Sequence, residues 1–349
     1  MTQSQERAQI GRHEVQEVLE QYGLGHIYEA RTFDRGSSKS PKVRIKALEG
    51  NYILKRCAPG QDDPDRVQLR HAVQLSLQEQ GYPTAGLVKA RDGRSFVQRG
   101  SRIYELFQFI EGRRFNRTPL QSKAAGYEMA RLHDHFNSWE DGVPSGRGYH
   151  GKLGVKESMQ RLPELLSPDD PHLRRGMVTI CNSLESLFAD AHERIEALGY
   201  AELPRTIVHG DWHPGNLIYD GNDVAAVLDF DSIRSEPRVS DLANGLLQYT
   251  MQIGDLDDVD HWPESLEVSL LDAFRTGYDK GTFEPLEQKE LAMIPLLMIE
   301  ALVVESIAPI AERGRFGSIP GDRFLRHIER EIGWIRPRVN ELVARMTEG

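Results

Sequence analysis

The chain is 349 residues long, carries a formal net charge of −10 and is 39% hydrophobic. This length predicts two domains or two lobes of one fold, and this composition excludes a disordered chain and a fibrous repeat. The negative charge argues against a general affinity for nucleic acid or for anionic membranes. Residues 1–115 are nevertheless net positive, and residues 116–349 are strongly negative. This division would suit an anionic ligand bound by the first part of the chain and a metal or a cationic substrate bound by the second.

Targeting and membrane signals are not evident in the sequence. Residues 1–26 contain no apolar run typical of a signal peptide, and the most apolar stretch, 291–310, is interrupted by two prolines and two glutamates. The two cysteines, Cys57 and Cys181, form neither a disulfide framework nor a metal-binding spacing. We therefore expect a cytoplasmic protein without a membrane segment.

The first part of the chain reads as a β-rich lobe with one crossing helix. A helix is predicted over 13–22, a hairpin follows with its turn at residues 49–51 and ends at Lys55, and Asp63-Pro64 begins a helix that stops before Gly81. Two further strands are predicted over 95–98 and 103–110. Residues 1–110 are thus predicted to form an N-terminal nucleotide-binding lobe.

The remainder, residues 111–349, is predicted to be a mostly helical lobe with the catalytic and substrate groups. The predicted helices cover 119–137, 155–165, 173–198, 240–253, 264–279, 286–311 and 321–346. Short apolar runs between Thr206 and Asp231 surround an Asp220-Gly221 turn and predict a small hairpin. The fold class that follows is α+β.

The strongest chemical signal is the segment from His209 to Asn216, followed by the hairpin and by Asp229-Phe230-Asp231. The turn at Asp220-Gly221 should bring Asn216 and Asp229 side by side. An amide oxygen and a carboxylate are hard ligands suited to Mg²⁺, and a third acid, Asp211, could accept a hydroxyl proton. This arrangement is typical of phosphoryl transfer, which depends mainly on positioning and charge neutralisation.

These residues resemble the catalytic core of the aminoglycoside phosphotransferase and choline kinase superfamily, and residues 40–56, 78–93 and 104–112 are similar to its homoserine-kinase-like and spore-coat-associated members. The resemblance implies a two-lobed protein-kinase-like fold and ATP-dependent phosphorylation of a small-molecule hydroxyl, with Mg²⁺. It implies Asp211 as the catalytic base, Asn216 and Asp229 as metal ligands and Lys55 on the nucleotide phosphates. Asp241 and His209 would support the catalytic loop. The acceptor stays open among homoserine, an amino sugar, choline and related alcohols, and so does the oligomeric state.

The N-terminal lobe departs from the family pattern in two places. Loop 34–40 has one glycine where a protein kinase has three, so backbone amides and the hydroxyls of Ser37 and Ser38 are expected to contact the phosphates. The crossing helix has no acid between Arg66 and Gln78, so the usual glutamate partner of the lysine is missing there. We expect Gln68 or His71 to replace it, or Lys55 to be ordered only when nucleotide binds.

Two further pairs of residues are candidates for ligand binding. The main chain near Gln108 and Phe109 is expected to bond an adenine edge, because this segment should connect the lobes. Glu300 and Glu305 interrupt an apolar helix, where a carboxylate is costly unless it is paired or faces a cleft. We therefore take both glutamates as candidates for contacting a polar substrate.

Three competing functions are weaker. A protein kinase is disfavoured because Gly210 replaces the arginine that would read an activation-loop phosphate, and because the segment from Asp229 to Asp241 is too short for a peptide platform. A metal-dependent phosphohydrolase would use the histidines and aspartates of 209–213 and 229–231 as ligands but leaves Lys55 without a role. A degenerate kinase fold that binds nucleotide without catalysis is suggested by the missing helix glutamate.

Overall fold

The computed structural model describes residues 8–34, 36, 39–137, 148–167 and 169–348, and the chain divides into two compact units. The N-terminal unit comprises Met1–Arg114 and Asn216–Asp231, and the helical unit comprises Phe115–Gly215 and Ser232–Gly349. This division differs from the predicted boundary after residue 110 mainly because the segment Asn216–Asp231, which includes a hairpin, belongs to the first unit.

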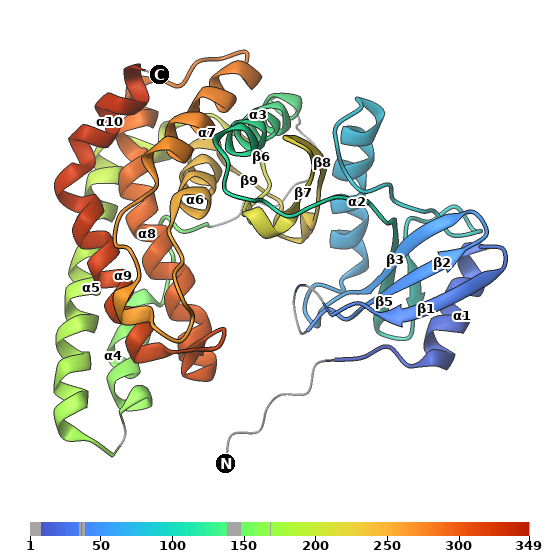
Figure 1. Cartoon of the computed structure of the whole chain (residues 1–349), viewed down its shortest axis with the longest axis horizontal. Helices are drawn as coiled ribbons and strands as arrows, with labels where there is room; N and C mark the ends of the chain where they lie inside the picture. The colour runs from blue at the N-terminus through green and yellow to red at the C-terminus, as the bar shows by residue number, and fades with distance from the viewer. Residues whose placement is uncertain (1–7, 35, 37–38, 138–147, 168, 349) are drawn as a thin grey trace. The chain divides into compact units, whose positions relative to one another are not determined.

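The N-terminal unit is built on an antiparallel sheet with the strand order β1-β2-β3-β5-β4 (Figure 1). Its elements are α1 (Arg12–Tyr22), β1 (Ile27–Thr32), β2 (Lys42–Ala47), β3 (Gly50–Arg56), α2 (Pro64–Glu79), β4 (Val97–Arg99), β5 (Arg102–Gln108), β7 (Leu217–Asp220) and β8 (Asp223–Val227). The β2–β3 ladder extends to Ala47 opposite Gly50, so its turn is Leu48-Glu49, slightly earlier than the sequence predicted.

The alternation of side chains along β3 and β5 gives the sheet two different faces. Tyr52, Leu54, Tyr104 and Leu106 share one core cluster with the buried residues of α1. Successive side chains in a strand point to opposite faces. Lys55 and its neighbours on β5 therefore point away from α1.

The β7–β8 hairpin is joined to the rest of the N-terminal unit by backbone pairing. Val227 bridges Thr84 and Tyr219 bridges Arg113. At its tip, Gly221 has a φ of +60°, a left-handed conformation that glycine adopts without steric cost. The expected turn at Asp220-Gly221 is present, with Asp220 paired to Asp223.

The helical unit contains eight described helices and small antiparallel strand pairs. They are α3 (Pro119–His135), α4 (Val155–Leu166), α5 (Pro171–Ala197), α6 (Arg238–Thr250), α7 (Val268–Gly281), α8 (Gln288–Arg313), α9 (Gly321–Ile335) and α10 (Val339–Glu348), with β6 (Arg205–Val208) paired to β9 (Arg234–Pro237) and β10 (Arg315–Phe316) to β11 (Ile319–Pro320). The prediction of a single helix over 321–346 is wrong in one respect. The segment forms two helices divided at Arg336–Arg338, where Pro337 lacks a backbone N–H.

Helix α8 is the central helix of the helical unit and contacts α4, α5, α6, α9 and α10 (Figure 1). It is long and apolar enough to span a membrane by length and composition, but 78% of its most apolar window is buried inside the protein. Because its apolar residues are covered by neighbouring helices, α8 is a core helix of this unit. Glu300 and Glu305 both lie on it.

Candidate active site

Lys55 lies at the centre of a buried group of charges in the N-terminal unit. Its Nζ is 3.5 Å from Glu105 Oε2, 3.2 Å from Asp229 Oδ1 and 2.7 Å from Asp231 Oδ2, and its side chain is only 6% exposed. Burial alone would lower the pKa of Lys55, but the three carboxylates outweigh it and hold the pKa well above its usual value. Lys55 is therefore a fixed cation before any ligand binds.

Glu105 is the anchor of Lys55 that the sequence analysis missed. It lies on β5 directly opposite Lys55 in the β3–β5 ladder, so both side chains are on the same face of the sheet. From α2, Arg70 Nη2 and His71 Nε2 lie 3.0 and 2.8 Å from Glu105 Oε1. Burial would raise the pKa of Glu105, but the charges of Lys55 and Arg70 and the hydrogen bond with His71 hold it well below its usual value.

The crossing helix therefore contributes basic groups, and the acid comes from a strand. The imidazole of His71 contacts Glu105, the anchor of Lys55. The side chain of Gln68 is exposed. The prediction that Gln68 takes the place of the glutamate is wrong. The prediction that Lys55 becomes ordered only when nucleotide binds is also wrong, because Glu105 already holds it. The signal was present in the sequence: Glu105 is the one acid in the apolar run of β5, and an acid in such a run is costly unless paired.

Asp229 and Asp231 differ in their surroundings. The Asp229 side chain is 30% exposed, whereas that of Asp231 is 13% exposed and also lies 3.5 Å from Arg70 Nε. Burial would raise the pKa of Asp229, but Lys55 and Lys42 lower it to about 2. Asp229 also has a φ of +63°, a left-handed conformation uncommon for a residue with a side chain. Such backbone outliers concentrate at functional sites.

The hairpin places Asn216 opposite Leu228, the residue that precedes Asp229. The Leu217–Val227 pair ends the β7–β8 ladder, and beyond it the Leu228 N–H donates to the Asn216 carbonyl at 2.8 Å. Asn216 is largely buried, and Asp229 is ionised at neutral pH. An amide oxygen and an ionised carboxylate on adjacent chain segments form a donor set that fits a hard divalent cation such as Mg²⁺.

In the helical unit, Asp241 fixes the backbone of the loop that carries Asp211. Its two oxygens accept hydrogen bonds from the N–H groups of His209 (2.8 Å) and Gly210 (3.0 Å), and His133 Nε2 lies 3.2 Å from the same carboxylate. Burial would raise the pKa of Asp241, but the contact with His133 and the charges around it lower it. The loop thus starts from a rigid, charged point of attachment at the N-terminus of α6.

Gly210 and His209 set the local conformation around Asp211. Gly210 has a φ of +77°, and a Cβ there would overlap the Arg234 guanidinium, whose Nη1 donates to the Gly210 carbonyl at 3.2 Å. The Asp211 N–H donates to His209 Nδ1 at 3.3 Å, and His209 is fully buried. These contacts hold the backbone, while the Asp211 side chain is 43% exposed.

The two glutamates of α8 have different neighbours. Glu305 accepts hydrogen bonds from Tyr149 Oη (2.8 Å) and Gln248 Nε2 (2.6 Å). Burial raises the pKa of Glu305 to about 7, and the charge of Asp211 adds to this rise. Glu300 is fully buried and contacts two histidines. The charge of Asp211 thus acts on Glu305.

The other residues predicted to contact the nucleotide are Ser37 and Ser38 of loop 34–40 and the main chain of Gln108 and Phe109. Ser37 and Ser38 lie outside the described residues. The N–H groups of Gln108 and Phe109 donate to Gly86 O (2.7 Å) and Asn51 O (2.8 Å), so they already serve the sheet and its neighbours. An adenine contact in this segment would have to use carbonyl groups or the residues that follow Phe109.

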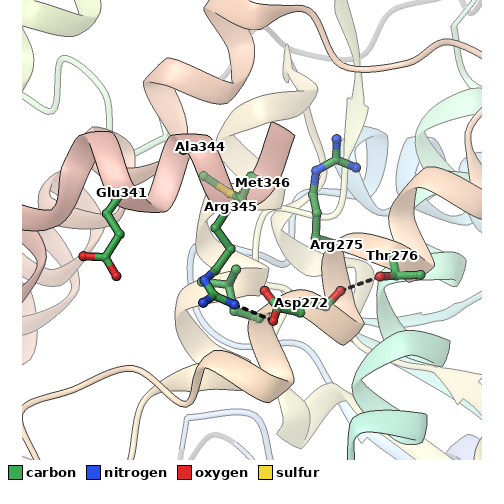
Figure 2. A pocket seen from close by; sticks show the side chains of 8 residues that line it. Asp272, Arg275, Thr276, Glu341, Ala344, Arg345 and Met346 are labelled. Atoms are coloured by element: carbon green, nitrogen blue, oxygen red, sulfur yellow. Dashed lines mark hydrogen bonds and ion pairs between the residues drawn. The ribbon is translucent and has the colours of Figure 1, made fainter. Parts of the chain in front are cut away.

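A hollow of about 480 Å³ between α7 and α10 holds none of the predicted site residues (Figure 2). Asp272, Glu341, Arg275 and Arg345 contribute its charges, and Arg345 Nη1 pairs with Asp272 Oδ2 at 2.7 Å. Because its two acids and two arginines balance in charge, this hollow does not compete with the acidic groups around Asp211 as a candidate active site.

With this geometry in place, the comparison with protein families is decisive. The model described as the phosphotransferase enzyme family (APH) matches residues 29–288, well over half of the chain. The chain belongs to the phosphotransferase enzyme family. The matched range contains Lys55, Glu105, Asp211, Asn216 and Asp229.

Curated relatives of this phosphotransferase are distant but extensive. The homoserine kinase of Bradyrhizobium sp. (strain ORS 278) is 23% identical over 310 residues, which cover 82% of this chain and 81% of the relative. The homoserine kinase of Zymomonas mobilis subsp. mobilis is 22% identical over 245 residues, which cover 69% of this chain and 68% of the relative.

Solved structures share the fold of the phosphotransferase. A microcompartment-associated aminopropanol kinase has a TM-score of 0.67 at 15% identity and covers 96% of this chain and 100% of its own. An amicoumacin kinase in complex with AMP-PNP and Ca²⁺ has a TM-score of 0.64 at 14% identity, covering 91% and 93%. The predicted α+β kinase-like fold, with a β-rich N-terminal and a helical C-terminal region, and the assignment to a phosphotransferase enzyme are confirmed.

Proposed function

We propose that this phosphotransferase is a kinase that moves the γ-phosphoryl group of ATP to a hydroxyl of a small metabolite bearing an ammonium group. The observation that carries the proposal is the ion pair of Lys55 and Glu105 next to Asp229. A buried, pre-oriented cation beside a pair of hard oxygen donors matches what a loose phosphoryl-transfer transition state requires. The distant relatives named as homoserine kinases agree with this class of reaction.

The N-terminal unit supplies the groups for the nucleotide. Lys55 would donate to phosphate oxygens, and its position is maintained by Glu105 whatever Asp229 contacts. Asn216 and Asp229 would hold Mg²⁺, which neutralises charge on the phosphates when it is bound. Asp231 stays paired with Lys55 and Arg70, so its role is to position the lysine.

The helical unit supplies the general base. Asp211 would accept the proton of the acceptor hydroxyl as its oxygen attacks phosphorus. Its side chain is exposed enough to meet a substrate, while its backbone is fixed through Asp241 and His209. A base held in this way loses little conformational freedom on reaching the reactive geometry.

The preference for an ammonium group follows from Glu305. Its carboxyl feels the charge of Asp211, so two acids act on one region of the helical unit. A substrate ammonium there would relieve their mutual repulsion and favour the ionised form of Glu305. Homoserine and aminopropanol, which appear in the names of the relative and of a solved structure, both carry an amine and a hydroxyl.

The competing functions lose their support. The degenerate kinase was suggested by the missing lysine partner, and Glu105 provides one. A phosphohydrolase would need His209 and Asp231 as metal ligands, yet His209 Nδ1 accepts from the Asp211 N–H and Asp231 is ion-paired.

The test is ADP release with a panel of matched acceptors: amino alcohols, the same alcohols without the amine, and water alone. We expect ADP release with at least one amino alcohol, at a kcat/KM at least about tenfold above its deaminated analogue, equivalent to about 1.4 kcal/mol. Phosphate release that does not depend on any acceptor would identify a hydrolase. Equal rates for the paired alcohols would contradict the ammonium preference and leave the kinase assignment intact.

A further inference from the structure

Three side chains of the helical unit converge in a cluster that the phosphotransfer chemistry does not use. They are His150, in the segment before α4, His192 on α5 and Glu300 on α8. His150 Nδ1 lies 3.1 Å from Glu300 Oε2, and His192 Nδ1 lies 3.2 Å from Glu300 Oε1. One ligand atom from each of the three lies within 4.8 Å of the other two.

The separations match the spacing of donors around a tetrahedral metal ion. Metal–nitrogen and metal–oxygen bonds of about 2.0–2.2 Å place neighbouring ligand atoms roughly 3.4 Å apart in a tetrahedron. Two histidines and one glutamate with a position left for water form one of the known catalytic-type zinc ligand sets. Imidazole donors also favour transition metals over Mg²⁺, which prefers oxygen ligands alone.

The burial of Glu300 favours a cation beside it. The Glu300 side chain is fully inaccessible and sits in the apolar α8, and His150 is also buried. An ionised carboxylate in such a place is costly unless a cation neutralises it. A divalent ion bound by the two histidines would provide this charge, and the half-exposed His192, at 38%, gives it a route from solvent.

The surroundings orient His150 as metal-binding histidines are usually oriented. Its second ring nitrogen, Nε2, lies 2.7 Å from Glu196 Oε1, which is the carboxylate–histidine–metal arrangement that fixes the tautomer and leaves the other nitrogen free to bind. The ring of His192 is parallel to that of Phe188, with an interplanar angle of 4°. Both imidazoles are thus held by groups outside the cluster.

We propose that His150, His192 and Glu300 bind one divalent transition-metal ion of the zinc class, with Glu196 positioning His150. The ion would join the segment containing Tyr149 to α5 and α8. Because Tyr149 donates to Glu305, metal binding would stabilise that hydrogen bond as well. The site shares no residue with the Asn216–Asp229 pair, so its test needs no nucleotide.

The experiment is a titration of metal-free full-length protein with Zn²⁺ against a chromophoric chelator, in the presence of excess Mg²⁺, and with Co²⁺ followed by visible absorption. We expect one Zn²⁺ per chain and the intense Co²⁺ absorption of a four-coordinate site. His192→Ala and Glu300→Gln should weaken Zn²⁺ binding by more than about 100-fold, and Glu196→Gln by about 10- to 100-fold. Zn²⁺ should also raise the Tm of the wild-type protein and not that of His192→Ala.

The matched controls are His172→Ala and Glu193→Gln, which change exposed residues of the same helix, α5, and should bind Zn²⁺ like the wild type. If Glu300→Gln fails to fold, the Zn²⁺ affinity of His192→Ala tests the proposal alone. The His192 side chain is half-exposed, so this variant should fold. Wild-type protein that binds less than one Zn²⁺ per chain would overturn the proposal. So would Zn²⁺ binding by His192→Ala with wild-type affinity, which would indicate surface sites.

Discussion

Lys55 on β3 and Glu105 on β5 are direct cross-strand partners, with Nζ 3.5 Å from Oε2 in a site almost closed to solvent. Strand pairing, rather than a helix that could move, therefore sets the position of the lysine. Arg70 and His71 of α2 hold the other oxygen of the same carboxylate. The arrangement fixes both the charge and the place of Lys55 before nucleotide binds.

The first prediction concerns Lys55→Ala. The change should raise the KM for ATP and lower kcat, because a cation on the phosphates acts in both the ground and the transition state. We expect kcat/KM for ATP to fall more than about tenfold, or roughly 1.4 kcal/mol of transition-state stabilisation. Steady-state kinetics at saturating acceptor measures this, with Lys46→Ala on the neighbouring strand as a matched control because that side chain is 49% exposed. A loss within twofold would show that another group holds the phosphates.

Glu105→Gln tests the anchor itself. It leaves Lys55, Arg70 and His71 around a neutral group, and removing one partner of a buried ion pair costs about 3–5 kcal/mol of unfolding free energy. Denaturant unfolding should show this loss, and the KM for ATP should rise in the protein that remains folded. Glu79→Gln, which changes an exposed residue at the end of α2, is the control. Unchanged ATP kinetics in a folded Glu105→Gln protein would mean that the anchor does not position the lysine.

The two aspartates after β8 should separate into different roles. Asp229→Asn removes the ionised, partly exposed carboxylate and should abolish Mg²⁺-dependent activity. Asp231→Asn removes a partner of Lys55 and Arg70, so it should cost stability and retain a measurable Mg²⁺ dependence. Activity measured against Mg²⁺ concentration distinguishes them, and an equal loss in both variants would show that the metal ligand is misassigned.

Glu305 should give the protein a pH-dependent stability. Its pKa is raised from 4.5 to about 7, so between these values the native carboxyl holds a proton that the unfolded chain has lost. The native state then binds more protons, and its unfolding free energy falls as pH rises through this window. One pKa unit corresponds to about 1.4 kcal/mol, so the fall is at most about 3 kcal/mol and smaller where solvent screens the charge.

Glu305→Gln should remove this pH-dependent contribution to the unfolding free energy. The unfolding free energy of the variant should therefore increase relative to that of the wild type between pH 4.5 and 7. Urea unfolding at a series of pH values measures the difference, with the exposed Glu193→Gln as control. The KM of the wild type for an amino alcohol should also fall as pH rises through about 7, because Glu305 becomes ionised. A pH-independent difference between the wild type and Glu305→Gln would contradict the raised pKa.

Much of the fold could be predicted from local patterns. Alternation in β2, with Val43, Ile45 and Ala47 buried, is visible in the sequence, and so are the Asp63-Pro64 start of α2 and the turn that places Asn216 beside Leu228. These features depend on residues close in the sequence. Periodicity therefore finds them without any knowledge of tertiary structure.

The parts that were missed depend on register between distant segments. Nothing local aligns residue 105 with residue 55, because the pairing of β3 and β5 is set by the whole sheet. The contact of Asp241 with His209 and Gly210, although its role as a brace was expected, also requires the folded position of α6. Residues of the cluster around Glu300 come from three segments far apart in the chain. An acid within an apolar run of sequence, as at Glu105 and Glu300, is the signal that such partners exist.

We propose that Asp211 is the base of an ATP-dependent transfer to a hydroxyl. The most direct measurement is single-turnover phosphoryl transfer by Asp211→Asn, with ATP affinity measured in parallel and Asp190→Asn on α5 as a matched surface control. We expect nearly unchanged ATP affinity and a transfer rate lowered by about 10²- to 10⁴-fold, the range for loss of a general base. A transfer rate equal to that of the wild type would contradict it.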